Sequence, residues 1–288
     1  MVPDWPCTVN IRYEVSRQIV ATEEAVKCYK EGNRVVLLHY VHCNTCHYCL
    51  NGHHMVCETL RKTSFDPGGW VEYVRMPVIN VDRGIFVLPD HVSYEDATFV
   101  ELLACVLRGQ RLAHLQPGSS IGVISSGIAG LLHVMLARAF AAHRVIATDI
   151  SEYRLEAARR LGADVTLHPQ EDLPSRLCQV NQGLLADLVS AIAQALESVK
   201  RGGNISLFAT TDIGSTTPIP MNDLFWRTEI TLTTSYGGGP GDYQTALDLT
   251  GAKTIPITQL ITRHFGLAEA SKGFGLVADG QNPMQGNN

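Results

Sequence analysis

Short apolar strands and amphipathic helices alternate through the middle of this 288-residue chain, and this alternation constrains its fold more than any other feature. Successive parallel strands in one sheet require a crossover, which is right-handed in nearly all proteins. The alternation therefore predicts an α/β domain with a doubly wound parallel sheet. The apolar periodicity predicts strands over 120–124, 144–150 and 164–167, helices over 127–141 and 152–161, and later strands over 203–209 and 229–236.

The first hundred residues follow a different pattern, in which strands and turns predominate. Strands are predicted over 35–41, 69–76 and 86–88, and helical spacing begins near residue 94 and continues to 114. We therefore predict a division of the chain into three segments. These are residues 1–103 as a β-rich domain, residues 104–251 as the doubly wound domain, and residues 252–288 as a return to the first domain.

Four cysteines, Cys43, Cys46, Cys49 and Cys57, lie close together in the β-rich part, in a lobe over about residues 39–60. Thiolates at this spacing can surround one zinc ion tetrahedrally. Because all four ligands are cysteine, no coordination position is left for water or substrate, so the site is predicted to be structural. Disulfides and an iron–sulfur cluster are the alternatives, although the seven-residue gap before Cys57 differs from the ferredoxin spacing.

Histidines are frequent around this cysteine motif and could ligate a metal in principle. They are His39, His42, His47, His53 and His54. With four thiolates competing for the ion, we expect these imidazoles to be solvated surface groups. The lobe is thus predicted to hold a metal through sulfur alone.

The overall composition excludes several functional classes. A hydrophobic content of 45% is sufficient for a buried core, and a net charge of −5 without a basic tract argues against nucleic acid as a partner. The apolar stretches are interrupted well before the roughly 18 residues that a membrane-spanning helix needs, so no membrane partner is expected. With no secretory leader before the cysteines, we predict a reducing, cytoplasmic location.

A partial dinucleotide-binding motif occupies the turn between the first strand and the first helix of the doubly wound domain. Such a motif uses three glycines, for a tight turn, for close approach of the pyrophosphate, and for packing of the helix on the strand. Gly127 and Gly130 stand at the second and third positions, whereas Ser125 stands at the first, so we expect a strained or reshaped turn. The predicted cofactor-contacting residues of this turn are Ser125, Gly127, Ile128, Ala129 and Gly130.

The second strand of this domain ends at an acidic residue, Asp149. A carboxylate at this place can accept hydrogen bonds from ribose hydroxyls and would repel a 2′-phosphate, so the sequence favours NAD(H) over NADP(H). The alternative is that Asp149 caps the next helix near Ser151. Arg154 can lie over the adenine, pair with Asp149 or remain an exposed helix charge.

Taken together, these segments resemble the zinc-containing medium-chain dehydrogenases, the family of alcohol, polyol and threonine dehydrogenases. The resemblance extends over most of residues 11–275 in the family's order. It implies a GroES-like β-rich catalytic domain, incomplete here, around a Rossmann domain, with a catalytic zinc that polarises an alcohol and a hydride transfer to NAD. The matching segments are the cysteine motif, Gly68-Gly69-Trp70-Val71-Glu72-Tyr73-Val74, Val100-Glu101-Leu102, the turn at Gly127, and Asp149-Ile150-Ser151.

The resemblance also implies ligands for the catalytic zinc, and the chain departs from them. The family uses an early cysteine, a Gly-His-Glu triplet and a third residue at the position of Glu101. Here Tyr13 replaces the histidine of the triplet, and a neutral phenol is a poor zinc ligand. Cys7 is too close in sequence to be the early cysteine. Glu14 and Glu101 remain as residual ligands, with a salt bridge or a surface charge as the alternative.

Parts of the family's fold are expected to be absent or shortened. The first barrel strands have no counterpart before residue 11, and the last strand of the catalytic domain is replaced by residues 281–284. Residues 187–190 run almost directly into a predicted helix over 192–199. This shortening predicts a sheet that lacks a central strand, with buried unpaired backbone groups that each cost about 1–3 kcal/mol.

Two functions remain open from the sequence. The first is an NAD-dependent zinc dehydrogenase acting on a small secondary alcohol or polyol, which glutamate at position 101, as in polyol-type members, favours. The second is a non-catalytic relative that retains the structural zinc and weak dinucleotide binding. Residues 229–236 form the candidate edge strand for a homodimer or homotetramer. The identity of the alcohol is not encoded in a recognisable motif.

Overall fold

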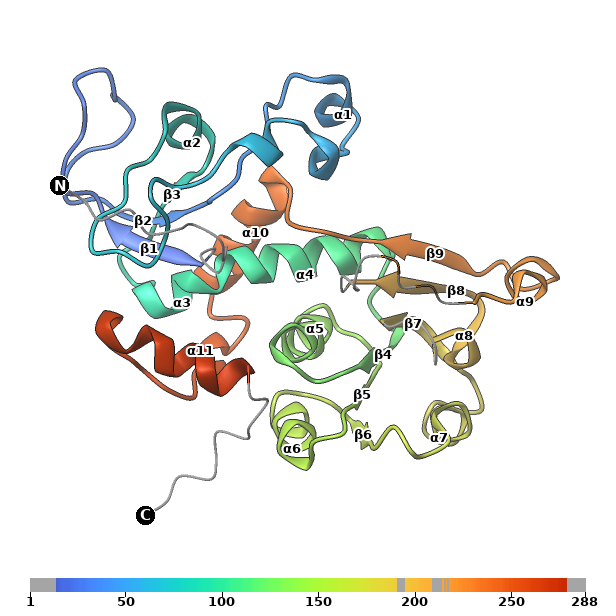
Figure 1. The fold of residues 1–288 in the computed structure, drawn as a ribbon. Helices are drawn as coiled ribbons and strands as arrows, with labels where there is room; N and C mark the ends of the chain where they lie inside the picture. Colours follow the sequence, from blue (N-terminus) through green and yellow to red (C-terminus); the bar gives the residue numbers. More distant parts are fainter. Residues whose placement is uncertain (1–13, 191–194, 209–213, 215, 217, 279–288) are drawn as a thin grey trace, which may run out of the picture. The chain divides into compact units, whose positions relative to one another are not determined.

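The computed structural model describes residues 14–190, 195–208, 214, 216 and 218–278. The chain forms two compact units (Figure 1). Among the described residues, one unit contains those up to Glu101 and those from Arg263 onward, and the other extends from Leu102 to Thr262.

The second unit is built on a six-stranded parallel sheet (Figure 1). The strand order is β6-β5-β4-β7-β8-β9, and all neighbouring pairs are parallel. The direction in which strands are added reverses between β4 and β7, which confirms the predicted doubly wound class. The strands are β4 (Ser120–Ile124), β5 (Arg144–Thr148), β6 (Val165–Leu167), β7 (Ala186–Ser190), β8 (Val199–Leu207) and β9 (Thr231–Thr234).

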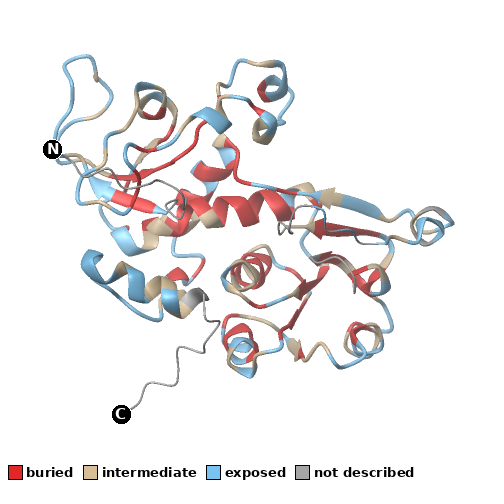
Figure 2. Cartoon of the chain, in the orientation of Figure 1, coloured by how far each residue is buried: buried red, intermediate tan, exposed pale blue. Residues whose placement is uncertain are grey.

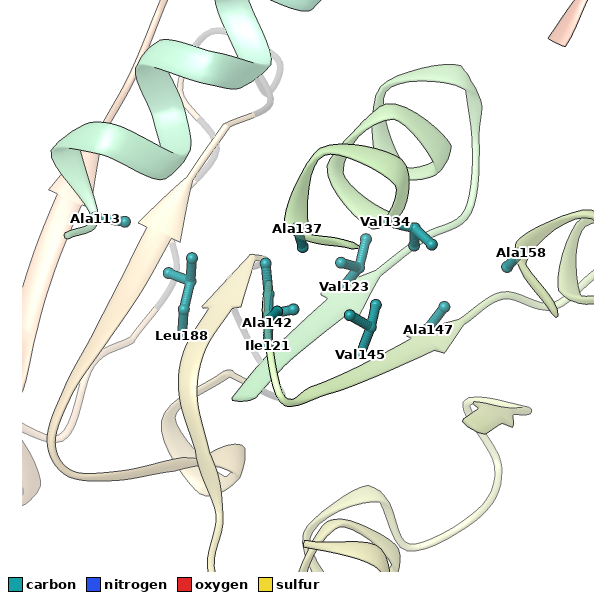
Figure 3. Packing of buried hydrophobic residues seen from close by; sticks show 10 residues of the cluster. All are labelled: Ala113, Ile121, Val123, Val134, Ala137, Ala142, Val145, Ala147, Ala158 and Leu188. Carbon is teal, nitrogen blue, oxygen red and sulfur yellow. The ribbon is translucent and has the colours of Figure 1, made fainter. Parts of the chain in front are cut away.

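Helices cover both faces of this sheet because alternate strand side chains point to opposite sides. On one face, Val145 and Ala147 of β5 share a core with Val134 of α5 (Ile128–Ala139), as Figure 3 shows. α6 (Glu152–Arg160) contributes to the same core. On the other face, Ile146 packs in a second core with Leu177 of α7 (Leu173–Val180). α8 (Ala195–Ser198) belongs to that second core.

The expectation of a missing central strand is wrong. β7 lies between β4 and β8 and pairs with both, with Leu188 opposite Ile121 on one side and Asn204 on the other. Leu188 contributes to one core and Val189 to the other, so five residues are enough to place a strand with two buried faces. Of the predicted helix over 192–199, residues 195–198 form α8, whereas Val199 is already the first residue of β8.

The first unit contains a three-stranded antiparallel sheet with the order β1-β2-β3. The strands are β1 (Val15–Gln18), β2 (Arg34–Leu37) and β3 (Ile85–Val87). Val15 lies opposite Leu37, and Val35 lies opposite Val87. Val15, Val35 and Leu37 form a small core with Phe65. Since residues 1–13 and 279–288 lie outside the described residues, the expectations for both ends of the catalytic domain stay predictions.

The strand predicted over 69–76 is wrong. This segment has no ladder, and its only bridge joins Arg75 to Asp66. Trp70 is 48% exposed and Tyr73 is 73% exposed, so the alternation in the sequence does not create a buried face. The ring of Trp70 instead lies edge-to-face against Phe274, with 4.9 Å between the centroids.

The helical spacing predicted over 94–114 corresponds to two helices, α3 (Tyr94–Thr98) and α4 (Val100–Leu112). Ser93 is the N-cap of the first and accepts a hydrogen bond from the Asp96 N–H at 3.0 Å.

Figure 2 shows burial concentrated in the central strands of the parallel sheet, whereas the edge strand β9 is largely exposed. No helix within the described ranges is both long and apolar enough to cross a membrane. The remaining helices are α1 (His47–Leu50), η1 (His54–Val56), η2 (Leu60–Lys62), α2 (Val78–Arg83), α9 (Met221–Phe225), α10 (Pro240–Gly251), η3 (Ile257–Leu260), η4 (Leu267–Glu269) and α11 (Ala270–Ala278).

Candidate functional site

The four cysteines of the first unit converge on one point. Their sulfur atoms all lie within 4.8 Å of one another, and the sulfurs of Cys43 and Cys49 are 3.9 Å apart. Zinc–sulfur bonds of about 2.3 Å in a tetrahedron place sulfurs about 3.8 Å apart, so the cluster has the size of a four-thiolate zinc site. Short helices position the ligands, because Cys46 precedes α1, Cys49 lies within it and Cys57 follows η1.

Backbone N–H groups point at these sulfurs. The N–H groups of Thr45 and Cys46 donate to the Cys43 sulfur at 3.5 and 3.2 Å and lower the pKa of that thiol to about 5. Burial raises the pKa of Cys57, but donation from the N–H groups of Cys43 and Thr59 outweighs burial and leaves it lowered. Burial raises the pKa of Cys49 to about 12. Burial thus opposes ionisation of Cys49, whereas N–H donors favour ionisation of Cys43 and Cys57, and a bound cation would favour the thiolate form of all four.

The expectation of solvated histidines is wrong for two of the five. His39 and His42 are buried, whereas His47 and His53 are exposed and His54 is half-buried. The physical reason is that all residues from 35 to 42 are buried, so the chain after β2 is part of the interior and carries these two imidazoles with it. Burial lowers the pKa of His39 to about 3 and keeps that imidazole neutral.

The predicted dinucleotide turn lies at the carboxyl edge of the parallel sheet. Ile124 at the end of β4 pairs with Thr148 at the end of β5, so Ser125 and Asp149 follow at the same edge. This edge, where the strand order reverses, is where doubly wound sheets bind ligands. Gly127 is the N-cap of α5, whose first N–H groups are available to a phosphate.

The turn departs from ideal geometry at the position where the motif has its first glycine. Ser125 has φ = 77°, a left-handed conformation that costs an L-residue about 1–2 kcal/mol. Gly130 fulfils the packing role, since a Cβ there would lie 2.0 Å from the carbonyl oxygen of Ser125. The strained turn that the sequence predicted is thus present.

Asp149 is only 4% exposed, and two backbone groups hold its carboxylate. The N–H of Ser126 donates to Oδ2 at 2.8 Å, and the N–H of Ser151 donates to Oδ1 at 2.9 Å. Arg154 places Nη1 3.6 Å from Oδ2. Asp149 therefore links the turn after β4 to Ser151, the N-cap of α6, and pairs with Arg154, although its carboxylate does not itself cap the helix.

Sequence reasoning did not single out Ser126. This residue is completely buried, and its hydroxyl donates to the carbonyl of Thr148 at 3.1 Å while its N–H binds Asp149. The sequence signal that could have indicated this role is a small polar residue inside the motif, directly after a strand that must pair with its neighbour. Ser126 thereby joins the two strand ends that flank the predicted dinucleotide site.

The residues predicted as residual catalytic-zinc ligands do not come together as a metal site. Glu14 is exposed. Glu101 is buried, and its Oε1 accepts a hydrogen bond from the hydroxyl of Tyr40 at 3.2 Å. Tyr13 lies outside the described residues. Among the residues that the structure describes, the four cysteines are the only group of three or more His, Cys, Asp or Glu side chains close enough to hold a metal. The described residues alone therefore do not form a second metal site, and the assignment of Glu14 and Glu101 stays a prediction.

His133 on α5 is a further buried imidazole, and the sequence analysis did not mark it. Burial lowers its pKa to about 4. The side chain of Gln110 lies 3.2 Å from Nδ1 and donates to the His133 carbonyl at 2.8 Å, while Nε2 has no hydrogen-bond partner among the described residues. The ring packs edge-to-face on Phe208, with 4.8 Å between centroids.

This imidazole makes the second unit sensitive to acid. Since the folded pKa lies below the ordinary 6.5, the stabilisation is complete above pH 6.5 and is lost as the pH falls toward 4. Between pH 7 and pH 5 we expect a loss of about 2 kcal/mol in the free energy of unfolding. His133→Leu should remove this dependence, as measured by hydrogen exchange of the β4 and β5 amides. An unchanged pH slope in that variant would contradict the assignment.

Comparison with known proteins places the chain in a family. An alcohol dehydrogenase GroES-like domain model matches residues 2–83, and a zinc-binding dehydrogenase model matches residues 129–252. L-threonine 3-dehydrogenase from Bacillus licheniformis is 30% identical over 282 residues, which are 93% of this chain and 79% of that protein. The chain belongs to the zinc-binding, medium-chain alcohol dehydrogenase family.

Two further relatives show the range of this similarity. Sorbitol dehydrogenase from Bacillus subtilis is 30% identical over 220 residues, or 73% of this chain, and the match spans 60% of the length of that enzyme. A protein named as a zinc-binding dehydrogenase from Sinorhizobium meliloti 1021, in a structure bound to NADP, is 26% identical, with a TM-score of 0.82 over 90% of this chain and 78% of that chain. The relatives thus include named polyol and amino-acid dehydrogenases.

Proposed function

We propose that this chain binds NAD(H) and oxidises a small secondary alcohol or polyol by hydride transfer to the nicotinamide. The observation that carries the proposal is the turn over 125–130, where Asp149 and the amino end of α5 meet at the carboxyl edge of the sheet. The relatives named for sorbitol and threonine support this reaction class. Glu101, at a position where polyol-type members have glutamate, supports the substrate class.

The choice of NAD over NADP depends on Asp149. Its carboxylate is fixed by two N–H donors at the strand end, where the ribose of a dinucleotide would lie. A 2′-phosphate would bring a second negative charge to this buried group. Arg154 is paired with the same carboxylate, so we propose that it offsets that repulsion only in part. Since one relative binds NADP, this preference is proposed for this chain and not for the family.

We assign the zinc of this chain to Cys43, Cys46, Cys49 and Cys57, in a structural role. When bound, the ion would offset part of the negative charge of the thiolates and join α1 to the segment after η1. Thiolates that bind zinc must stay reduced, which supports a cytoplasmic location. The exposed edge strand β9 supports a homodimer formed by pairing two such edges.

A second candidate function is a non-catalytic family member that keeps the structural zinc and weak dinucleotide binding. The contact that favours it is the hydrogen bond from Tyr40 to Glu101, because it engages the carboxylate that would otherwise bind a catalytic metal. Under this alternative the dinucleotide turn binds cofactor without turnover.

The test is a pair of measurements on the purified chain. NADH binding is followed by fluorescence titration, and NADH formation is followed by absorbance with NAD⁺ and a panel of polyols and secondary alcohols. We expect NADH formation with at least one polyol, and a preference for NAD⁺ over NADP⁺ of about tenfold or more that Asp149→Asn reduces. Binding without turnover would support the second candidate, and absence of binding would exclude both.

A further inference from the structure

The buried contact between Tyr40 and Glu101 bears on how many metal ions the chain holds. Tyr40 is 7% exposed and Glu101 is 6% exposed, and the hydroxyl of the tyrosine donates to Oε1 at 3.2 Å. The two residues are 61 positions apart, so the fold of the first unit brings them together. A buried carboxylate requires donors or a cation, and here a neutral phenol provides a donor.

Neighbouring rings hold the phenol in this position. The ring of His39 lies edge-to-face against that of Tyr40, with 3.9 Å between the centroids. The ring of His42 is also edge-to-face to Tyr40, with 6.3 Å between the centroids. Because all three rings are buried, the hydroxyl of Tyr40 has little freedom to leave Glu101. A metal at Glu101 would have to bind the carboxylate beside this hydrogen bond.

A zinc ion at Glu101 would also need further ligands. Catalytic zinc sites have three protein ligands, at about 2.0–2.3 Å from the ion. Glu14 is exposed, and no other group of three ligating side chains is assembled among the described residues besides the cysteines. A neutral phenol does not replace a thiolate or an imidazole as a zinc ligand.

We infer that the hydrogen bond between Tyr40 and Glu101 takes the place of a catalytic zinc centre, so that the folded chain holds a single zinc ion, at the four cysteines. Tyr40 is in this sense a positioning residue for Glu101. The inference concerns metal content and does not rest on the proposed function. It would hold for a chain that oxidises an alcohol and for one that only binds the cofactor.

The experiment counts zinc by mass spectrometry in the full chain, purified under reducing conditions without added metal and again after equilibration with excess zinc and desalting. We expect one zinc per chain in both preparations. The isosteric variant Glu101→Gln, which retains an acceptor for Tyr40, should also contain one zinc. Cys46→Ser should contain none, because it removes a ligand of the site that we do assign.

Cobalt reconstitution provides a second readout. A single tetrathiolate site should show only sulfur-to-cobalt charge-transfer and tetrahedral bands, identical in the wild type, in Glu101→Gln and in Tyr40→Phe. Two zinc ions per wild-type chain, one of them lost in Glu101→Gln, would overturn the inference. A wild-type chain without zinc, or cobalt bands of a second site that depend on Glu101, would overturn it as well. NADH titration of each variant monitors the second unit, and circular dichroism monitors folding.

Discussion

Replacing Cys49 by serine is expected to abolish zinc binding and to unfold the lobe over residues 43–57 locally. Cys49 is buried, and its sulfur lies 3.9 Å from that of Cys43, so the substitution removes an internal ligand. Helix α1 has four residues and η1 has three, far below the roughly 12–15 residues at which an isolated helix becomes stable. We therefore expect metal binding to supply most of the free energy that orders this lobe.

The expected size of this effect is large because structural zinc contributes about 10–16 kcal/mol to small zinc domains. We expect zinc content to fall to background and the amide protection over residues 43–57 to decrease by at least about 100-fold, or about 3 kcal/mol. Hydrogen exchange and metal analysis measure the two quantities. NADH binding should persist, since the dinucleotide turn belongs to the other unit.

Cys28→Ser is the matched control for this prediction. Cys28 is an exposed cysteine of the same unit and lies outside the cluster, so the same chemical change should leave both zinc content and protection as in the wild type. If Cys49→Ser retained full zinc, or if Cys28→Ser lost it, the assignment of the four ligands would be wrong.

The doubly wound sheet could be predicted because its elements depend mostly on local periodicity. β4 occupies the predicted residues 120–124. The turn after it carries a motif in which Gly130 allows the helix to pack closely against the turn. The prediction was wrong over 69–76, where alternation is present but no neighbouring strand pairs with the segment. Periodicity describes what a segment could bury, whereas a strand also needs a partner edge.

The polar interior of the first unit could not be predicted in the same way. His39 and His42 are adjacent to the cysteine motif in sequence, and that proximity suggested a solvated metal lobe, whereas the chain there is part of the core. The partnership of Tyr40 with Glu101 joins positions 61 residues apart, so no local pattern reveals it. Likewise, Ser126 gains its role only because β4 and β5 end side by side.

A second large effect is expected from Gly130→Ala in the dinucleotide turn. The added Cβ would lie 2.0 Å from the carbonyl oxygen of Ser125, far inside van der Waals contact. Either α5 or the turn must move, which we expect to cost about 3 kcal/mol in the free energy of unfolding. The same movement shifts the N–H groups that would bind the pyrophosphate, so NADH affinity should fall about 100-fold or more. Denaturant unfolding and NADH titration measure the two effects.

Gly127→Ala and Ser125→Gly are the matched controls in the same turn. Apart from the adjacent residues, no described atom lies within 4 Å of a Cβ at position 127, so that alanine should cost much less stability than Gly130→Ala. It should still weaken NADH binding by blocking the approach of the phosphate. Ser125→Gly should relieve the left-handed strain, while glycine adds conformational entropy to the unfolded chain. The net result should be a stabilisation of the second unit by about 0.5–1 kcal/mol. Equal losses of stability in Gly127→Ala and Gly130→Ala would contradict our assignment of Gly130 to helix packing and of Gly127 to the approach of the phosphate. If NADH affinity were unchanged in both alanine variants, the turn over 125–130 would not be the dinucleotide site.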